Sequence, residues 1–87
     1  MAAITTTADK LRHAIASDIN PAVSEEDLGD DVQLFETRVI DSLGIFGLVS
    51  FIEQEFGVEV LDEELVPENF GSIGALARFV DEKRAAA

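Results

Sequence analysis

The amino-acid sequence predicts an all-α fold: a bundle of three main helices and one short helix, with a long loop between the first and second helices. Apolar residues recur three or four positions apart in the regions 4–20, 41–57 and 72–84, which is the spacing of a buried helix face. Turn signals such as Asn20-Pro21 and Gly57 separate these regions. We therefore expect one domain over residues 1–87, with a core spanning about residues 4–84.

The first helix is predicted from one apolar stripe, formed by Ile4, Ala8, Leu11, Ile15 and Ile19. Threonines at positions 5–7 can cap its start, because their hydroxyls accept hydrogen bonds from the first free N–H groups. Its end is predicted at Asn20, since the residue before a proline is displaced from helical geometry. His13 falls opposite the stripe and is expected to face solvent.

Residues 21–40 contain a proline, a glycine and scattered apolar residues without sustained helical or alternating spacing. A connection of this length seldom remains structureless inside a compact domain. We therefore expect an ordered loop whose apolar side chains cover the ends of the helices.

The second helix is predicted to begin at Asp41-Ser42 and to end at Phe56, before Gly57, a residue type that commonly follows the last helical turn. Its inner face carries Ile45, Leu48, Val49, Ile52 and Phe56. Its outer face is smooth and weakly polar, and carries Leu43, Gly47, Ser50 and Gln54.

The last third of the chain is predicted to hold an extended loop and two helices. Residues 58–60 alternate like a strand, but a lone short strand has no partner, so we expect a loop. Pro67 suits the first position of a short helix over residues 67–70. Ser72 then caps a final helix, which points Arg78 outward and buries Ile73, Leu76, Phe79 and Val80, while residues 85–87 are expected to fray.

Eighteen acidic residues against six basic ones give a formal net charge of −12. Such a field repels nucleic acid and anionic membranes and favours basic protein surfaces, although acidity can equally serve solubility alone. The absence of cysteine excludes disulfides and thiolate metal sites. The start of the chain lacks the pattern of a secretory signal, and no run of roughly 18 apolar residues occurs. We expect a monomeric, cytoplasmic protein that binds neither nucleic acid nor membrane.

Little in the sequence supports an enzyme or a metal site. His13 is the single histidine, and no cysteine or clear serine–acid pairing accompanies it. The acidic runs 25–27 and 30–31 do not follow the spacing of a calcium-binding loop, so they are interpreted as solvated acids. We therefore expect no catalytic residue and no metal ligand.

The strongest functional signal is the segment V-I-D-S-L-G at residues 39–44. It places Ser42 at a helix start, where unpaired N–H groups and the positive end of the helix dipole can accommodate a phosphate ester on the serine. The alternative is that Asp41 or Ser42 only caps the helix. Local sequence alone leaves both interpretations open.

Asp41-Ser42-Leu43 resembles the attachment motif of acyl and peptidyl carrier proteins, and the similarity covers about residues 4–84. Downstream, the stretches 48–49, 51–53 and 55–60 and the segment 67–73 are similar to that family. Upstream, Leu34-Phe35-Glu36 resembles stand-alone D-alanyl and other aminoacyl carriers. The resemblance implies an acyl-carrier-protein-like helical bundle.

By this resemblance, a phosphopantetheinyl transferase would move a 4'-phosphopantetheine arm from coenzyme A to Ser42. The arm would hold an acyl or aminoacyl group as a thioester, loaded by one enzyme and used by a downstream transferase or synthase. The resemblance thus implies a stand-alone carrier and not an enzyme. The alternative is an acidic helical interaction module without a prosthetic group, such as a nucleic-acid mimic that occupies a basic groove.

Two glycines in the second helix bear on the cargo. Fatty-acid-synthesis carriers usually have further acids where this chain has Gly44 and Gly47, and each glycine costs about 0.5–1 kcal/mol inside a helix. Close approach of a partner and a tolerated weak point are both open explanations. Together with the stretch at 34–36, this departure favours an aminoacyl or specialised acyl cargo of secondary metabolism over a fatty acyl cargo.

The predicted partner-docking face comprises Asp41, Leu43, Phe46, Gly47, Ser50 and Glu53, with Asp62 and Glu63 as further charges at its rim. Leu43 and Phe46 are its apolar members. Phe46 also lies at the flank of the inner stripe, so packing against the 21–40 loop is the favoured alternative for its side chain.

Overall fold

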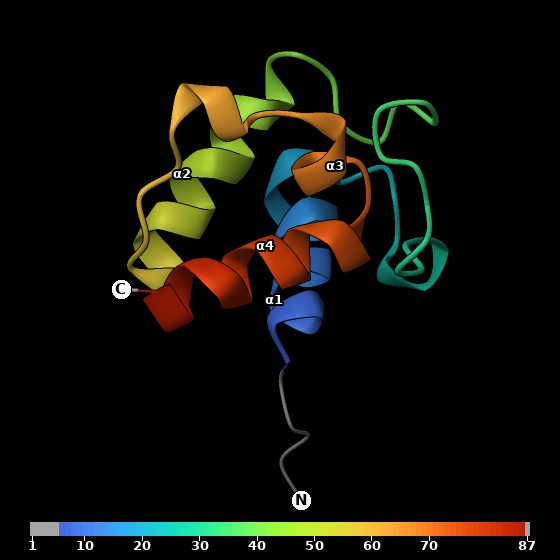
Figure 1. Cartoon of the computed structure of the whole chain (residues 1–87). Coiled ribbons are helices and arrows are strands. Elements are labelled where there is room, and N and C mark those ends of the chain that lie inside the picture. Colours follow the sequence, from blue (N-terminus) through green and yellow to red (C-terminus); the bar gives the residue numbers. More distant parts are fainter. Residues whose placement is uncertain (1–5, 87) are drawn as a thin grey trace, which may run out of the picture.

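The computed structural model describes residues 6–86, and every regular element within them is a helix (Figure 1). Helix α1 spans Thr7–Ala14 and continues as a π-helical turn over Ile15–Ile19, α2 spans Gly44–Phe56, α3 spans Pro67–Phe70 and α4 spans Ile73–Ala86. Short 3-10 turns occur at Glu25–Asp27 and Asp62–Glu64. The all-α prediction, with three main helices, one short helix and a long first loop, is confirmed. Ile4 and Thr5 of the predicted first helix lie outside the described residues.

The start of α1 is fixed by reciprocal hydrogen bonds between Thr6 and Asp9. The Thr6 hydroxyl accepts from the Asp9 N–H at 3.1 Å, while the Thr6 N–H donates to the Asp9 carboxylate at 3.5 Å. The helix ends at Asn20, as predicted, where the Asn20 N–H donates to the Ile15 carbonyl at 2.7 Å. This bond closes the π-helical turn, which apolar spacing did not predict.

The loop between α1 and α2 is ordered by burial of three of its side chains. Leu28, Leu34 and Ile40 are almost completely buried in the core, while the loop's charged residues remain exposed. The prediction that this loop covers the helix ends is confirmed. The aromatic ring of Phe35 departs from that pattern, because it stays 40% exposed next to Leu34.

Polar contacts hold this loop against α1 and α4. The guanidinium of Arg12 donates to the Leu28 carbonyl at 2.6 Å and forms ion pairs with Asp9 and Asp30. Backbone bonds add two more ties, from the Leu34 N–H to the Gly71 carbonyl at 2.8 Å and from the Gly74 N–H to the Asp30 carbonyl at 3.0 Å. The loop therefore has a defined path into the first turn of α2.

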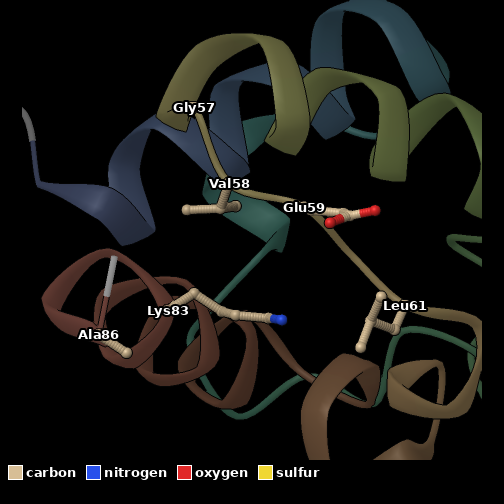
Figure 2. Close-up of a pocket in the computed structure, with 6 residues that line it drawn as sticks. All are labelled: Gly57, Val58, Glu59, Leu61, Lys83 and Ala86. Carbon is tan, nitrogen blue, oxygen red and sulfur yellow. The ribbon is translucent and has the colours of Figure 1, made fainter.

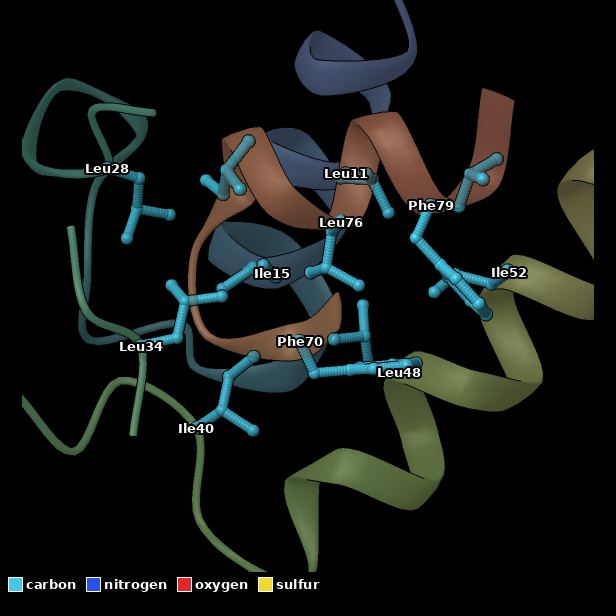
Figure 3. Close-up of a cluster of buried hydrophobic side chains, with 12 residues drawn as sticks. Leu11, Ile15, Leu28, Leu34, Ile40, Leu48, Ile52, Phe70, Leu76 and Phe79 are labelled. Carbon is cyan, nitrogen blue, oxygen red and sulfur yellow. The ribbon is translucent and has the colours of Figure 1, made fainter. Parts of the chain in front are cut away.

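The core lies where α1, α2 and α4 meet, with α3 covering one end (Figure 3). Its buried members are Leu11, Ala14, Ile15, Leu28, Leu34, Ile40, Leu48, Ile52, Phe70, Ile73, Leu76, Phe79 and Val80. The inward face predicted for α4 is confirmed in full. On α2 only Leu48 and Ile52 are fully buried, because Ile45, Val49 and Phe56 lie at the edge of the core.

The end of α2 is tied to its surroundings on several sides. Gly57 adopts a left-handed conformation with φ of 67°, as expected for the residue that ends a helix. The Glu53 carboxylate accepts from the Val60 N–H at 2.9 Å, which secures the extended segment 57–61. A hollow of about 300 Å³ separates this segment from the end of α4, and Lys83 reaches across it (Figure 2).

Candidate functional site at the start of α2

Asp41 caps α2. One oxygen of its carboxylate accepts from the N–H groups of Leu43 at 3.1 Å and Gly44 at 2.7 Å, and its own carbonyl accepts from the Ile45 N–H at 3.1 Å. The hydrogen-bonded turn therefore begins at Asp41, as predicted, although regular helix starts only at Gly44. The structure assigns the cap to Asp41 and not to Ser42.

Ser42 is exposed in this first turn, and its hydroxyl makes no hydrogen bond with another of the residues 6–86. The expectation that unpaired N–H groups at this helix start accommodate a phosphate ester is wrong, however. The N–H groups of Leu43 and Gly44 already donate to the Asp41 carboxylate. The serine is therefore accessible, but these N–H groups are not vacant.

An apolar hollow of about 320 Å³ opens beside Ser42. Its walls come from the first loop, the first turn of α2, the segment before α3 and α3 itself, and consist of Phe35, Ile45, Leu65, Val66, Pro67 and Phe70. The hollow brings together residues from three separate parts of the sequence. Periodicity identified the core but gave no sign of this hollow, because its walls combine loop and helix residues that are distant in the sequence.

The outer face of α2 presents two large apolar side chains to solvent. Leu43 is 79% exposed and Phe46 is 67% exposed, while Gly47 and Ser50 are exposed beside them. The expectation that Phe46 would more readily pack against the first loop is wrong. We call Leu43, Phe46, Gly47 and Ser50 the outer apolar face, and their role in docking stays a prediction.

Gly44 and Gly47 have a packing role within the chain. A Cβ atom on Gly44 would lie 3.2 Å from Ile19 Cγ2, and one on Gly47 would lie 3.0 Å from Ile19 Cδ1. The π-helical turn thus brings Ile19 against α2 where the glycines leave room. Two glycines one helical turn apart are a recognisable signal of such close approach.

The predicted charges at the rim differ in their surroundings. Asp41 is engaged in capping and Glu53 in bonding Val60, whereas Asp62 and Glu63 are exposed in a 3-10 turn. Their role in docking stays a prediction. Glu64, which the sequence argument did not single out, pairs with Lys83 at 2.7 Å. The hydrogen bond from Lys83, followed by one from the Leu61 N–H, lowers the pKa of the Glu64 carboxyl below its ordinary value.

His13 faces solvent, as predicted. Its Nδ1 lies 2.9 Å from a Glu25 carboxylate oxygen, which makes a surface pair. Among residues 6–86 no group of three or more histidine, cysteine, aspartate or glutamate side chains could hold a metal ion. No helix in this part of the chain has the length and apolar character needed to span a membrane.

Comparison with known proteins bears on the same region. The family model described as "Phosphopantetheine attachment site" matches residues 9–80. The probable acyl carrier protein PigG of Serratia sp. is 33% identical over 61 residues, which are 70% of each chain. The acyl carrier protein of Wolinella succinogenes is 25% identical over 76 residues, covering 87% of this chain and 95% of its own.

A solved structure is also similar. A chain in the "Crystal structure of FAD-dependent dehydrogenase" matches with a TM-score of 0.72 and 30% identity, covering 80% of this chain and 97% of that one. Carrier proteins of the matched family work with a phosphopantetheinyl transferase and with biosynthetic enzymes. The chain therefore belongs to the phosphopantetheine attachment-site family, as a carrier protein and not an enzyme, with 4'-phosphopantetheine as its prosthetic group.

Proposed function

We propose that this chain is a stand-alone carrier whose 4'-phosphopantetheine arm is attached to the hydroxyl of Ser42. The observation that carries this proposal is the exposure of Ser42 in a turn that Asp41 already caps. Because capping does not use the serine, its hydroxyl is available for transfer.

The residues around Ser42 fit such an arm. The hydroxyl is a primary alcohol open to solvent, and the apolar hollow beside it can cover an uncharged part of the arm or of a small cargo. When bound, the group supplies a thiol that holds cargo as a thioester. The chain itself contributes a rigid turn through Asp41 and shelter from water through Ile45 and Leu65.

We favour an aminoacyl or specialised acyl cargo of secondary metabolism. In the first turns of α2 the outer apolar face carries no acid, so docking there would rest on apolar contact more than on attraction to a basic patch. The hollow beside Ser42 is open to the surface, and its volume of about 320 Å³ suits a compact group. Both features support a partner set unlike that of a fatty acyl carrier.

The similar crystal structure suggests one class of partner. The matched chain is shorter than this one, because 97% of it aligns with 80% of these residues, and a chain of that size is too small to enclose FAD and a dehydrogenase active site. We infer that it accompanies the dehydrogenase as a separate chain. We therefore propose that a flavin enzyme removes two hydrogen atoms from the cargo while this carrier holds it.

Attachment is tested by intact mass after incubation with coenzyme A and a broad-specificity phosphopantetheinyl transferase. The wild type should gain the mass of one arm, and Ser42→Ala should gain none. Ser50→Ala is the matched control, since Ser50 is another exposed serine of the same helix and its loss should leave modification intact. A wild type that stays unmodified while another carrier is loaded would support an interaction module without a prosthetic group.

The cargo proposal is tested by loading Ser42 from coenzyme A analogues that bear a short aminoacyl, a short acyl or a long acyl group. Compact cargo should shift the methyl NMR signals of Ile45 and Leu65 at the hollow. The Val58 methyl signals, at the opposite end of α2, serve as the control. Larger shifts with the long acyl group than with both short groups would favour a fatty acyl carrier instead.

A further inference from the structure

Attachment of the arm at Ser42 would place the negative charge of a phosphodiester in an already acidic region of the chain. A phosphodiester there would add a negative charge next to Asp41, in a chain whose formal net charge is already −12. The N–H groups of Leu43 and Gly44 already donate to the Asp41 carboxylate, and that of Ile45 donates to the Asp41 carbonyl. A cation supplied by the chain would therefore have to be a basic side chain and not one of these N–H groups.

Most basic side chains are committed to other partners. Three form ion pairs, namely Lys10 with Glu55, Arg12 with Asp9 and Asp30, and Lys83 with Glu64. Arg84 lies over the ring of Phe56, 5.8 Å from its centre. Arg38 and Arg78 form no ion pair with any of the residues 6–86, and Arg38 stands only four positions before Ser42.

The backbone at Arg38 is unusual. Its φ of 61° makes it the only residue other than glycine with a positive φ within residues 6–86. That conformation costs a residue with a Cβ atom about 1 kcal/mol. Residues held in this way concentrate at functional sites, where the surrounding structure offsets the cost. Here the Arg38 N–H donates to the Phe35 carbonyl at 3.1 Å, which closes a turn just before Asp41.

This turn brings Arg38 to the attachment site. Arg38 and Asp41 line one polar hollow of about 410 Å³, together with Phe35, Glu36 and Ile40. Phe35 and Ser42 in turn line the neighbouring apolar hollow. A fully extended stretch of four residues spans at most about 14 Å, and the turn makes the separation shorter. The long arginine side chain can therefore reach a group on Ser42.

We propose that the guanidinium of Arg38 is the counter-ion of the phosphodiester on Ser42, to whose oxygens it donates hydrogen bonds. The inference rests on the proposed attachment at Ser42. The planar guanidinium matches a phosphate group with paired N–H donors, which a lysine ammonium cannot do. The left-handed turn at Arg38 would then serve to bring the cation beside Asp41, with which it lines the same hollow.

The test compares the apo and holo proteins of wild type, Arg38→Gln and Arg38→Gly in urea at low salt. Arg38→Gln should lower the folding equilibrium constant of the holo form about fivefold more than that of the apo form. Arg38→Gly should stabilise the apo form, since glycine adopts positive φ without cost, yet lose the same holo-specific contribution. The holo-specific loss should shrink as salt is raised.

Arg78→Gln is the matched control, because it makes the same charge change on the outer face of α4. It should affect apo and holo forms equally. The phosphorus NMR signal of the holo protein should also move in Arg38→Gln but not in Arg78→Gln.

Equal effects of Arg38→Gln on the two forms, with an unmoved phosphorus signal, would overturn the inference while leaving attachment at Ser42 intact. Failure of the wild type to gain the arm would be seen in its mass and would overturn both proposals.

Discussion

The two ends of α2 are built in opposite ways. At the end near Gly57, Phe56 packs edge to face with Phe51, 6.0 Å between ring centres, and lies beneath the cationic groups of Lys10 and Arg84. At the start, Leu43 and Phe46 have most of their surface in water. One end is covered by the chain's own side chains, and the other leaves apolar surface uncovered.

The two ends of α2 therefore differ in what they contribute: contacts within the fold at one end, and an exposed surface at the other. Near its end, α2 is tied to α1 by the Lys10–Glu55 ion pair and to the following segment by the Glu53–Val60 hydrogen bond, and the Lys83–Glu64 ion pair ties that segment to α4. The start of α2 contributes a capped turn, an exposed serine and a solvent-facing apolar surface. A partner can therefore cover the start without removing contacts that hold the fold.

The largest expected change in the free energy of unfolding distinguishes the inner face of α2 from its exposed start. Ile52→Ala should lower the free energy of unfolding by about 2–5 kcal/mol, because Ile52 is fully buried and its truncation leaves a cavity. Leu43→Ala should change it by less than about 0.5 kcal/mol, yet slow the transfer of the arm or the loading of cargo. Urea denaturation measures the change in stability, and the rate of arm transfer or cargo loading measures the change in function. A loss in Leu43→Ala as large as in Ile52→Ala would break the comparison.

A second pair of variants replaces a phenylalanine with alanine at each end of α2. Phe56→Ala should cost about 2 kcal/mol, since it removes a half-buried ring with its aromatic and cationic neighbours. Phe46→Ala should cost less than about 0.5 kcal/mol because the ring is 67% exposed. Thermal and urea unfolding of the two variants check this directly. Comparable losses would show that Phe46 supports the fold.

A smaller effect concerns how the stability contributed by Glu64, beyond the covered end of α2, depends on pH. Because the folded-state pKa of Glu64 is lowered, the stability it contributes is present above its unfolded pKa of about 4.3 and is lost as the pH falls through the folded value. Glu64→Gln should thus destabilise by under about 1 kcal/mol at pH 7, and the difference from wild type should vanish in stronger acid. Glu63→Gln, which removes the charge of an exposed neighbouring carboxylate, is the matched control. Urea midpoints over that pH range provide the measurement.

The smallest effect tests the contact between Ile19 and α2. Gly47→Ala should leave stability within about 0.5 kcal/mol, because improved helix propensity is offset by crowding against Ile19 Cδ1. Ile19→Val removes that methyl group, so it should cost less in the Gly47→Ala background than in the wild type. A double-mutant cycle in urea measures this coupling. Strict additivity would mean that Gly47 does not serve the close approach.

Sequence reasoning identified the helices and the turn at the start of α2 because both depend on local patterns. Leu11, Ile52 and Leu76 recur at helical spacing, and all are buried. Asn20 and Gly57 carry turn signals that the structure confirms. The Asp41-Ser42 pair was predicted to lie at a helix start for the same reason, and the first hydrogen-bonded turn of α2 begins at Asp41.

The features that sequence reasoning missed depend on contacts between distant residues. The ties of Arg12 to the Leu28 carbonyl and to Asp30 join α1 to a loop sixteen and more positions away, and nothing in local spacing reveals them. The exposure of Phe46 also depended on the path of the first loop, which periodicity does not fix. Glu64 and Lys83 are paired only because α4 returns beside the 62–64 turn.

The two backbone ties that fasten the first loop to the corner between α3 and α4 have a consequence for hydrogen exchange. The N–H groups of Leu34 and Gly74 can exchange with solvent only when those ties open, whereas we expect the buried middle of α2 to exchange through unfolding of the whole domain. Leu34 and Gly74 are thus natural reporters of loop opening next to Ser42. Their exchange rates, followed with and without a partner, would show whether the loop is held or released when the carrier is engaged.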